Sequence, residues 1–343
     1  MKAARLHEYN KSLQLDEVDL PKPRGEEVIV KVGAAGICHS DIHFMHGEWR
    51  DALPVKLPLT IGHETAGYVE EVGESVRGLG KGDVVAVFGG WGCGVCQACK
   101  GGDEQLCISP GWPGLSQNDG GYAEYMHVPS YRFLVKAKGL DPKYVAPLTD
   151  AGLTPYRAIK KVRHLLNPNS FVLLFGAGGL GSYAIQYLKL LTPAKIITIE
   201  RSEAKTRLAK EMGSDHVINS REEDVASSIK KITESGGIDV VLDIVASKET
   251  LDIGIASLRK RGTLVLVGLM GSSFNIPIVQ SVINEYSVIG SLWGNYNELA
   301  EVISLASTKK LKTPITQFRL NEVNKAIESL ETGKTQGRSI LVP

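Results

Sequence analysis

The sequence predicts an α/β protein that combines a doubly wound parallel sheet with a β-rich, partly open barrel. Between residues 171 and 292, short apolar runs alternate with stretches of helical periodicity. This alternation is typical of a parallel sheet covered by helices. Before residue 150 the chain is rich in glycine and in short β-type runs separated by turn residues, which favours antiparallel strands over helices.

The expected elements suggest two domains. The first part contains expected strands at residues 27–32, 66–72 and 83–88. In the second part the expected strands are 171–175, 195–200, 216–218, 239–245, 263–267 and 287–292. The expected helices are a stretch that follows the glycine run 176–181 and continues to 191, and the stretches 202–212, 222–232 and 248–258. The tail adds a helix at 321–330 and a strand at 339–342. We therefore expect one domain of residues 1–153 and 292–343 and a second domain of residues 154–291.

The composition indicates a globular protein without a dominant charge. Apolar residues make up 43% of the 343 residues, and 39 Lys+Arg stand against 38 Asp+Glu, which leaves a net charge of +1. Such a balance creates no field that recruits nucleic acid, and no run approaches the roughly 18 apolar residues of a membrane span. The first residues lack an apolar signal core. We therefore expect a cytoplasmic protein that binds neither nucleic acid nor membrane.

Four of the five cysteines form a cluster with the spacing Cys-x2-Cys-x2-Cys-x7-Cys. They are Cys93, Cys96, Cys99 and Cys107. Four thiolates complete the tetrahedral coordination of zinc, so the cluster predicts a structural zinc ion. The alternatives are disulfides or a nucleic-acid zinc finger. The odd cysteine number argues against disulfides, and the lack of a histidine pair or distant cysteine pair argues against a finger.

The fifth cysteine predicts a second zinc ion with a different task. Cys38 opens the run Cys38-His39-Ser40-Asp41-Ile42-His43, and Gly62-His63-Glu64 follows later in the chain. A cysteine, a histidine and a carboxylate from separate parts of the chain leave one zinc position open, and a catalytic zinc requires such a position. The sequence therefore predicts two zinc ions per chain.

A glycine-rich turn predicts a dinucleotide site. Gly176, Gly178 and Gly181 directly follow the apolar run 171–175 and open a helix. In this context glycine closes the turn and lets the backbone approach a pyrophosphate, while the helix N-terminus offers free N–H groups. We count Leu180, within the same turn, among the expected cofactor-binding residues.

The residues after the next strand bear on the choice between NAD and NADP. Glu200 ends that strand, 19 residues beyond Gly181. A carboxylate there accepts hydrogen bonds from both ribose hydroxyls and repels a 2′-phosphate, which favours NAD. Arg201 beside it could accommodate such a phosphate. We therefore expect NAD, with NADP the less favoured alternative.

One run carries a resemblance to a known family. It is Gly62-His63-Glu64-x2-Gly67-x5-Gly73-x2-Val76. With Cys38, the cysteine cluster and the glycine-rich turn, this run resembles the zinc-containing medium-chain alcohol dehydrogenase family, and the resemblance covers essentially the whole chain. It implies a GroES-like catalytic domain, a Rossmann NAD-binding domain and a homo-oligomer, either a dimer or a tetramer.

The resemblance also implies a set of zinc ligands. Cys38 and His63 match two ligands of the catalytic zinc. The third ligand is expected in the run Pro147-Leu148-Thr149-Asp150-Ala151, where many members have cysteine and this chain has Asp150. Carboxylate oxygen is an acceptable zinc ligand. Glu64 resembles the family glutamate that can approach or replace a zinc ligand, and the resemblance leaves open whether it coordinates here.

Further residues match family positions around the reacting groups. Ser40 and His43 resemble a proton relay from the substrate hydroxyl to solvent, and Asp41 resembles a carboxylate that orients the zinc-bound imidazole. Three more residues resemble cofactor contacts of the family. His39 resembles a residue that contacts the pyrophosphate, and Thr154 resembles a residue at the nicotinamide face. Arg338 resembles an arginine that contacts both the cofactor phosphates and the glutamate beside the zinc histidine.

These assignments imply reversible hydride transfer between NAD(H) and a small primary or secondary alcohol or its aldehyde or ketone. Aromatic and apolar residues in segments that border the pocket of the family favour apolar alcohols. They are Phe44, Trp49, Trp91, Trp112, Leu292 and Trp293. One alternative is a polyol, sugar or threonine dehydrogenase of the same superfamily. A second alternative is a protein that binds NAD and zinc without catalysis.

Overall fold

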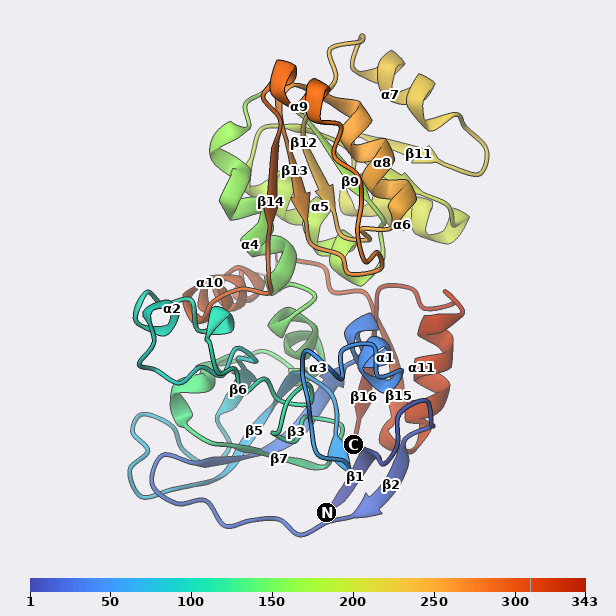
Figure 1. The fold of residues 1–343 in the computed structure, drawn as a ribbon. Helices are drawn as coiled ribbons and strands as arrows, with labels where there is room; N and C mark the ends of the chain where they lie inside the picture. The colour runs from blue at the N-terminus through green and yellow to red at the C-terminus, as the bar shows by residue number, and fades with distance from the viewer. Residues whose placement is uncertain (309) are drawn as a thin grey trace. The chain divides into compact units, whose positions relative to one another are not determined.

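The chain folds into two compact units, seen in a computed structural model that describes residues 1–308 and 310–343. The first unit consists of Met1–Leu153 and Trp293–Pro343, and the second of Thr154–Leu292. Figure 1 shows the elements of each unit, coloured along the chain. Among the described residues, no helix is long and apolar enough to cross a membrane.

The first unit is built mainly from strands. Their bounds are β1 Lys2–Leu6, β2 Gln14–Glu17, β3 Val28–Gly36, β4 Leu59–Thr60, β5 Glu64–Val72, β6 Val84–Val87, β7 Tyr125–Val128, β8 Leu134–Lys136, β15 Ile315–Arg319 and β16 Arg338–Val342. The larger sheet has the order β15-β16-β3-β5-β6-β8, with β7 paired to β3, and the smaller sheet has the order β2-β1-β4. The expected antiparallel pairing holds in these sheets with one exception, because β15 and β16 run parallel.

Short helices connect the strands of the first unit. They are α1 His39–Met45, α2 Gln97–Lys100, α3 Pro142–Val145, α10 Tyr296–Ser307 and α11 Val323–Glu331, with 3-10 turns η1 Glu104–Leu106, η2 Tyr131–Phe133, η3 Ala146–Thr149 and η5 Leu320–Glu322. One strand pairing matters most for the site. In the antiparallel pair β3–β5, Gly36 lies opposite Glu64. The residues that follow β3 and those that precede β5 are therefore neighbours, which brings Cys38 close to His63.

The second unit is the predicted doubly wound sheet. Its strands are β9 Phe171–Phe175, β10 Lys195–Glu200, β11 His216–Asn219, β12 Ile238–Asp243, β13 Leu258–Leu266 and β14 Ser287–Gly290. All of them run parallel in the order β11-β10-β9-β12-β13-β14. The accompanying helices are α4 Leu153–Val162, α5 Gly179–Leu191, α6 Glu203–Met212, α7 Val225–Ile232, α8 Lys248–Ser257, α9 Ile278–Asn284 and the 3-10 turn η4 Arg163–Leu165.

Apolar side chains on the strands of this sheet pack against helices, which flank the sheet on both sides (Figure 1). One buried cluster joins Leu173 and Ile197 of the strands to Ile229 of α7 and Leu251 of α8. The chain proceeds from β9 to β10 on one side, and β12 lies on the other side. The carboxyl end of β9 is therefore the point where the strand order reverses, and doubly wound sheets bind their ligands at this point.

Two strands of the second unit are shorter than expected. The strand expected at 239–245 ends at Asp243, because the buried Asp243 carboxylate accepts hydrogen bonds from the N–H groups of Val245 and Ala246. Those N–H groups are turned away from the sheet ladder. The strand expected at 287–292 ends at Gly290.

Candidate functional site

Cys38 lies at the junction between β3 and α1. Its backbone is extended, with φ −112° and ψ 155°, and it forms the N-terminal cap position of α1. Gly36, two residues earlier, has no room for a side chain, because a Cβ atom there would lie 1.9 Å from Oε2 of Glu64. Glycine at position 36 therefore allows the close approach that puts the Cys38 thiol among the residues at the start of β5.

Asp41 connects three parts of the site through one buried carboxylate. Its Oδ2 atom accepts a hydrogen bond from the Cys38 N–H at 2.8 Å and another from the Tyr122 hydroxyl at 2.7 Å. Its Oδ1 atom lies 3.0 Å from Nδ1 of His63. Because an ionised carboxylate only accepts hydrogen bonds, we infer that Nδ1 of His63 carries the proton. The His63 Nε2 atom then presents its lone pair on the opposite side of the ring.

Four potential ligand groups meet in the buried interior of the first unit. They come from Cys38, His63, Glu64 and Asp150, and their ligand atoms all lie within 4.8 Å of one another. Oδ2 of Asp150 lies 3.5 Å from the Cys38 sulfur and 3.5 Å from Nε2 of His63. Around a tetrahedral zinc, typical bond lengths place neighbouring sulfur, nitrogen and oxygen ligands about 3.3–3.6 Å apart. The separations and the donor set therefore fit a zinc ion.

Arg338 holds the fourth group of this cluster. Its guanidinium binds both carboxylate oxygens of Glu64, through Nε to Oε2 at 2.9 Å and through Nη2 to Oε1. The same Nη2 atom lies 3.4 Å from Oδ2 of Asp150. Arg338 and Glu64 are both buried. A forked guanidinium–carboxylate pair is among the stronger ion pairs in proteins, so Glu64 is held on Arg338 while it adjoins the cluster.

The charges of the cluster shift the pKa values of its members. Burial is the largest single effect on His63 and opposes its charge, but the Asp41 carboxylate together with Asp150 and Cys38 outweighs it and raises the pKa of His63 well above the usual value. Burial opposes a charge on Asp150 as well, and the His63 hydrogen bond still lowers the pKa of Asp150. Burial raises the pKa of Glu64 to about 8 against the opposing Arg338 charge. The imidazole nitrogen must lose its proton to bind a metal, so a cation would replace that proton in the cluster.

The second cysteine group is a compact set of four thiols around α2. None of the five cysteines forms a disulfide. The sulfur separations are 4.0 Å for Cys93–Cys99, 3.4 Å for Cys96–Cys99 and 3.9 Å for Cys96–Cys107. Sulfur ligands of a tetrahedral zinc lie about 3.8 Å apart. Backbone N–H groups of Cys99 and Ile108 lower the pKa of Cys96 to about 6, which favours the thiolate that binds metal. This set also fits a zinc ion.

Helix α1 carries the expected relay residues beside the metal cluster. Ser40 and His43 are three residues apart on α1, and this spacing places two side chains on one helix face. The His43 Nδ1 atom lies 2.7 Å from Oε2 of Glu48, and its ring stacks on Trp49 with a centroid distance of 5.6 Å. His39 begins α1 and is exposed.

The three glycines of the glycine-rich turn in the second unit have different structural roles. Gly176 has φ +88°, in the left-handed region that favours glycine. A Cβ atom on Gly181 would lie 2.1 Å from the Gly176 carbonyl oxygen, whereas a Cβ atom on Gly178 would meet nothing within 4 Å. Gly176 and Gly181 are therefore required by the turn itself. Gly178 leaves open space at the start of α5, where a pyrophosphate binds in this motif.

Among the other expected nucleotide residues of the second unit, Glu200 contacts this turn directly. Glu200 ends β10 and is buried. Its Oε2 accepts a hydrogen bond from the Ala177 N–H, and its Oε1 accepts one from the Arg201 N–H, both at 2.9 Å. Oε1 also accepts a hydrogen bond from the Ser202 N–H at 3.3 Å, so Oε2 is the oxygen with a second lone pair for a ribose hydroxyl. Arg201 is exposed, Leu180 is half-buried, and Thr154 is buried near the start of α4. The turn and carboxylate fit a dinucleotide.

The aromatic residues that were expected to line the pocket lie in different environments. The Trp293 ring lies 5.5 Å from the His63 ring in an edge-on arrangement, and Trp112 lies 6.2 Å from Trp293. Trp293 has φ +47°, uncommon for a bulky residue, and its indole N–H donates to the Thr149 carbonyl oxygen at 2.8 Å. Trp293 thus lies beside the metal cluster, and Trp112 packs on Trp293. Of the others, Trp91 stacks on Phe133, Phe44 packs on Tyr9, Trp49 stacks on His43, and Leu292 is exposed.

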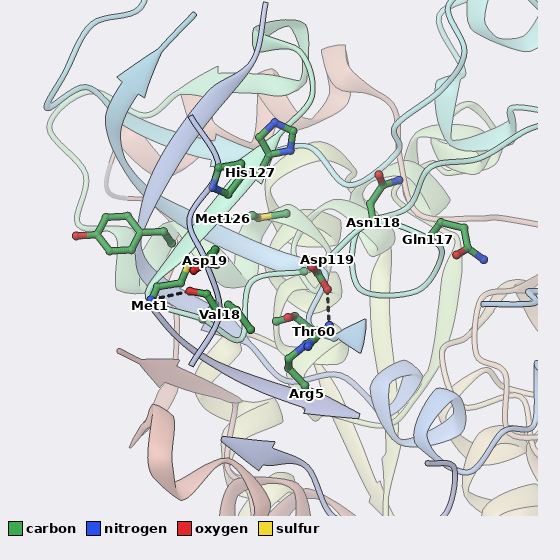
Figure 2. Close-up of a pocket in the computed structure, with 14 residues that line it drawn as sticks. Met1, Arg5, Val18, Asp19, Thr60, Gln117, Asn118, Asp119, Met126 and His127 are labelled. Atoms are coloured by element: carbon green, nitrogen blue, oxygen red, sulfur yellow. Dashed lines mark hydrogen bonds between the residues drawn. The ribbon is translucent and has the colours of Figure 1, made fainter. Parts of the chain in front are cut away.

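One cavity of the first unit lies apart from these residues. Figure 2 shows it, with a volume of about 360 Å³ and a lining that includes Arg5, Asp19, Asp119 and His127. None of the predicted metal, relay or cofactor residues lines it. Several of its polar groups bind the protein itself, as in the hydrogen bond from the Thr60 N–H to Asp119. We therefore do not assign the chemistry to this cavity.

Sequence reasoning missed Tyr122, which anchors Asp41. The residue before it gives a signal in retrospect, because Gly121 lies so close to β5 that a Cβ atom would meet the Thr65 hydroxyl at 1.9 Å. The Gly121 N–H donates to the Gly62 carbonyl oxygen, and the Tyr122 N–H donates to that of Ile61. Adjacent glycines before an aromatic residue thus mark a chain segment pressed against the residues that lead to His63.

Comparisons with known proteins show the family to which the chain belongs. Residues 24–139 match the alcohol dehydrogenase GroES-like domain family, and residues 179–308 match the zinc-binding dehydrogenase family. The fold and site thus define a zinc-binding dehydrogenase. An NAD-dependent alcohol dehydrogenase of Sulfurisphaera tokodaii is 43% identical over 100% of both chains. The chain therefore belongs to the zinc-containing medium-chain alcohol dehydrogenase family.

Two further relatives show the breadth of this similarity. The crystal structure of the alcohol dehydrogenase from Aeropyrum pernix shares 41% sequence identity and a TM-score of 0.95, over 100% of both chains. A D-arabinose 1-dehydrogenase (NADP(+)) of Saccharolobus solfataricus is 35% identical over 100% of this chain and 97% of its own. The family assignment predicted from the Gly62–Val76 run is confirmed, while relatives this similar differ in printed substrate and cofactor.

Proposed function

We propose that this protein catalyses the reversible oxidation of a small primary or secondary alcohol to an aldehyde or ketone, with NAD as the hydride acceptor. The observation that carries the proposal is the buried set of the Cys38 thiol, the His63 imidazole and the Asp150 carboxylate, whose separations suit one zinc ion. The similarity to an NAD-dependent alcohol dehydrogenase over the full length of both chains supports it.

In this proposal Cys38, His63 and Asp150 hold the catalytic zinc while Glu64 stays on Arg338. A zinc ion bound there supplies a Lewis acid for the substrate oxygen. Asp41 fixes the tautomer and orientation of His63. Ser40 would accept the proton of the substrate hydroxyl, and His43 on the same face of α1 would release a proton to solvent.

We assign NAD binding to residues 154–291 and zinc chemistry to residues 1–153 and 292–343. Gly176, Gly178, Leu180 and Gly181 would hold the pyrophosphate, and Glu200 would hold the ribose hydroxyls. The Glu200 carboxylate supports NAD over NADP, and exposed Arg201 is the one feature that favours NADP. Thr154, His39 and Arg338 are proposed as further cofactor contacts. Saturation curves with both cofactors test the choice, and a lower KM for NADP than for NAD would contradict it.

The cysteine cluster would hold a second zinc ion with a structural role, giving two zinc ions per chain. Four thiolates leave no position for substrate, so Cys93, Cys96, Cys99 and Cys107 can stabilise their lobe but cannot activate an alcohol. Elemental analysis of protein purified without chelator should find two zinc ions per chain. One zinc ion per chain would contradict the two-site proposal.

Apolar alcohols are the favoured substrates because Trp293 lies against the ring of His63 and Trp112 packs on Trp293. The relative that acts on D-arabinose keeps a sugar substrate as the second candidate. Rates of NADH formation with aliphatic and cyclic alcohols, sorbitol, arabinose and threonine distinguish the two. Faster turnover of arabinose than of every apolar alcohol would favour the sugar.

We also propose that the chain forms a homo-dimer or homo-tetramer and works in the cytoplasm. Helix α9 exposes Ile278, Val279, Val282 and Ile283, each more than 60% accessible. The neighbouring strand β14 is an edge of its sheet and has no second partner among the described residues. Exposed apolar patches and open strand edges are typical of interfaces. A reducing cytoplasm keeps the cysteine ligands as thiols.

Separate loss of the two metals tests the whole proposal. Cys38→Ala should lose one zinc ion per chain and hydride transfer together, because it removes a ligand of the open site. Cys107→Ala should lose the other zinc ion and lower thermal stability, while any folded protein retains hydride transfer. Zinc content, melting temperature and NADH formation are measured on both variants. Full activity after loss of the Cys38 zinc would sink the mechanism.

A further inference from the structure

We propose that Glu48 and His46 extend the proton path from His43 to solvent. This inference rests on the relay function proposed for His43 and deepens it. The three residues lie close together at and just beyond the end of α1, and they connect a largely buried imidazole to groups at the surface of the first unit. In the first step Glu48 takes the proton from His43, and in the second His46 passes it to water.

The backbone itself places Glu48 against His43. Helix α1 ends at Met45 with His46 as its cap, and Gly47 adopts a left-handed conformation with φ +70°. The Glu48 N–H donates to the His43 carbonyl oxygen at 3.1 Å, and the Gly47 N–H donates to that of Phe44 at 2.9 Å. This pair of bonds is the Schellman motif, which requires such a residue after the helix. The turn therefore returns Glu48 over the last turn of the helix, next to His43.

The contact between the two side chains fixes the direction in which His43 handles a proton. The Glu48 Oε2 atom lies 2.7 Å from Nδ1 of His43. An ionised carboxylate only accepts, so Nδ1 of a neutral His43 carries the hydrogen and Nε2 offers its lone pair. A proton that arrives at Nε2 makes the imidazolium, and the proton on Nδ1 then leaves to Glu48. Trp49, stacked on the ring at an interplanar angle of 27°, limits ring rotation.

The second oxygen of Glu48 faces another histidine. Its Oε1 atom lies 3.9 Å from Nδ1 of His46, and Nε2 of His46 lies 3.6 Å from Glu331. Side-chain exposure is 17% at His43, whereas Glu48 and His46 are about half exposed, at 50% and 46%. The path therefore begins in a site largely shielded from water and ends where water can accept the proton. Glu331 lies beyond that point.

Such a path is needed because the reaction releases a proton that has to leave the buried site. Oxidation of one alcohol transfers a hydride to NAD and releases one proton from the substrate hydroxyl. That proton passes from His43 to Glu48, and from Glu48 through His46 to solvent, so each group returns to its starting protonation state. In the reduction of a carbonyl compound the same groups deliver the proton in reverse order.

Buffer rescue distinguishes proton transfer from a purely structural role. In zinc-loaded full-length protein, Glu48→Gln should slow the first-turnover formation of NADH by about three- to tenfold in weak buffer, well below the 10²–10⁴ of a direct general base. The KM for NAD should not change. Added imidazole buffer should restore the rate, and Glu48→Asp should restore part of it. A rate loss that imidazole does not restore, or no rate loss, would overturn the proposal.

Two controls separate this inference from the relay function. Glu331→Gln removes a carboxylate of similar exposure beyond the path and should leave the rate unchanged. His43→Asn should slow NADH formation whether or not Glu48 takes part. If His43→Asn slows the reaction and Glu48→Gln does not, the inference fails alone. If neither variant slows it, the relay function fails as well.

A second readout needs no turnover. Long-range proton–nitrogen NMR spectra of the histidine-labelled, zinc-loaded protein distinguish the two imidazole tautomers. His43 should carry its proton on Nδ1 in the wild-type chain. In Glu48→Gln this preference should weaken, because a carboxamide can also donate to Nδ1. A wild-type His43 with its proton on Nε2 would contradict the proposed direction of transfer.

Discussion

At the scale of single residues, the buried Asp41 carboxylate ties together the residues of the candidate metal cluster. It accepts hydrogen bonds from the Cys38 N–H and the Tyr122 hydroxyl, and it contacts Nδ1 of His63. Two expected zinc ligands are thereby tied to the same side chain. Carboxylates behind metal-bound histidines typically change metal affinity or activity by 10–100-fold when removed. The precision of the site therefore depends on Tyr122 as well, because that hydroxyl keeps the carboxylate in place.

Two buried tyrosines should respond oppositely to loss of the hydroxyl. Tyr122→Phe removes a hydrogen bond to a carboxylate and should cost about 1.5–3 kcal/mol of the free energy of unfolding of its unit. The Tyr187 hydroxyl is buried and has no hydrogen-bond partner among the described residues, so Tyr187→Phe should be neutral or slightly stabilising. Urea unfolding of both variants measures the difference. Equal losses in the two variants would contradict this interpretation.

The residue types of the metal cluster were open to prediction, but their supports were not. Cysteine, histidine and aspartate predict metal binding in this family context because their side chains are common metal ligands. Tyr122 and Glu48 have no such signal, because tyrosine and glutamate occur in many roles. Their positions depend on pairings that only the fold supplies: the segment before Tyr122 against Gly62, and the left-handed turn at Gly47.

At the level of elements, the turn between β9 and α5 offers a matched pair of glycine variants. Gly178→Ala should keep the stability of the second unit, because its Cβ atom meets no protein atom within 4 Å, but it should weaken NAD binding by filling the pyrophosphate space. Gly181→Ala should instead destabilise the unit, because its Cβ atom would lie 2.1 Å from the Gly176 carbonyl oxygen.

Thermal unfolding and calorimetric titration with NAD separate these two effects. The expected pattern is an unchanged melting temperature with weaker NAD binding for Gly178→Ala, and a lowered melting temperature for Gly181→Ala. NAD affinity equal to wild type in Gly178→Ala would exclude a pyrophosphate at that position.

The buried strands were the best-predicted elements. The bounds of β9 and β10 agree with the expected runs 171–175 and 195–200, because continuous apolar stretches flanked by polar or glycine residues have clear ends. The parallel pairing of β15 with β16 was not predictable from a local pattern, since it joins strands separated by α11. Helix α10 was missed although Asn295 and Glu298 form a capping box at its start, which is a sequence signal for a helix.

At the scale of the whole molecule, we propose that one metal site serves stability and a different metal site serves the chemistry. The four-cysteine cluster surrounds α2, which has only four residues, and so short a helix is not stable alone. A metal bound to four thiolates can fix such a lobe. The buried Cys38, His63 and Asp150 site lies between β3, β5 and η3 of the same unit, and the nucleotide turn belongs to the other unit. Family membership could be predicted because the four-cysteine cluster, the Cys38 and His63 segments and the glycine-rich nucleotide turn all occur in one chain.

The exposed face of α9 provides the last prediction, which concerns assembly. Val282 is 72% exposed within the single chain and lies with Ile278, Val279 and Ile283 on a seven-residue helix. If a second copy covers this face, Val282→Lys would place a charge in an apolar interface, and burying an unpaired charge is strongly unfavourable. The variant should therefore sediment as a smaller species than the wild-type protein.

Tyr144→Lys is the matched control, because Tyr144 is a half-exposed apolar residue on α3 of the other unit. It should keep the wild-type assembly. Light scattering coupled to size-exclusion chromatography measures the mass of each variant, and circular dichroism verifies that each is folded. A folded Val282→Lys variant with the wild-type oligomeric mass would show that the α9 face is not the interface. A monomeric wild-type chain would remove the homo-oligomer proposal itself.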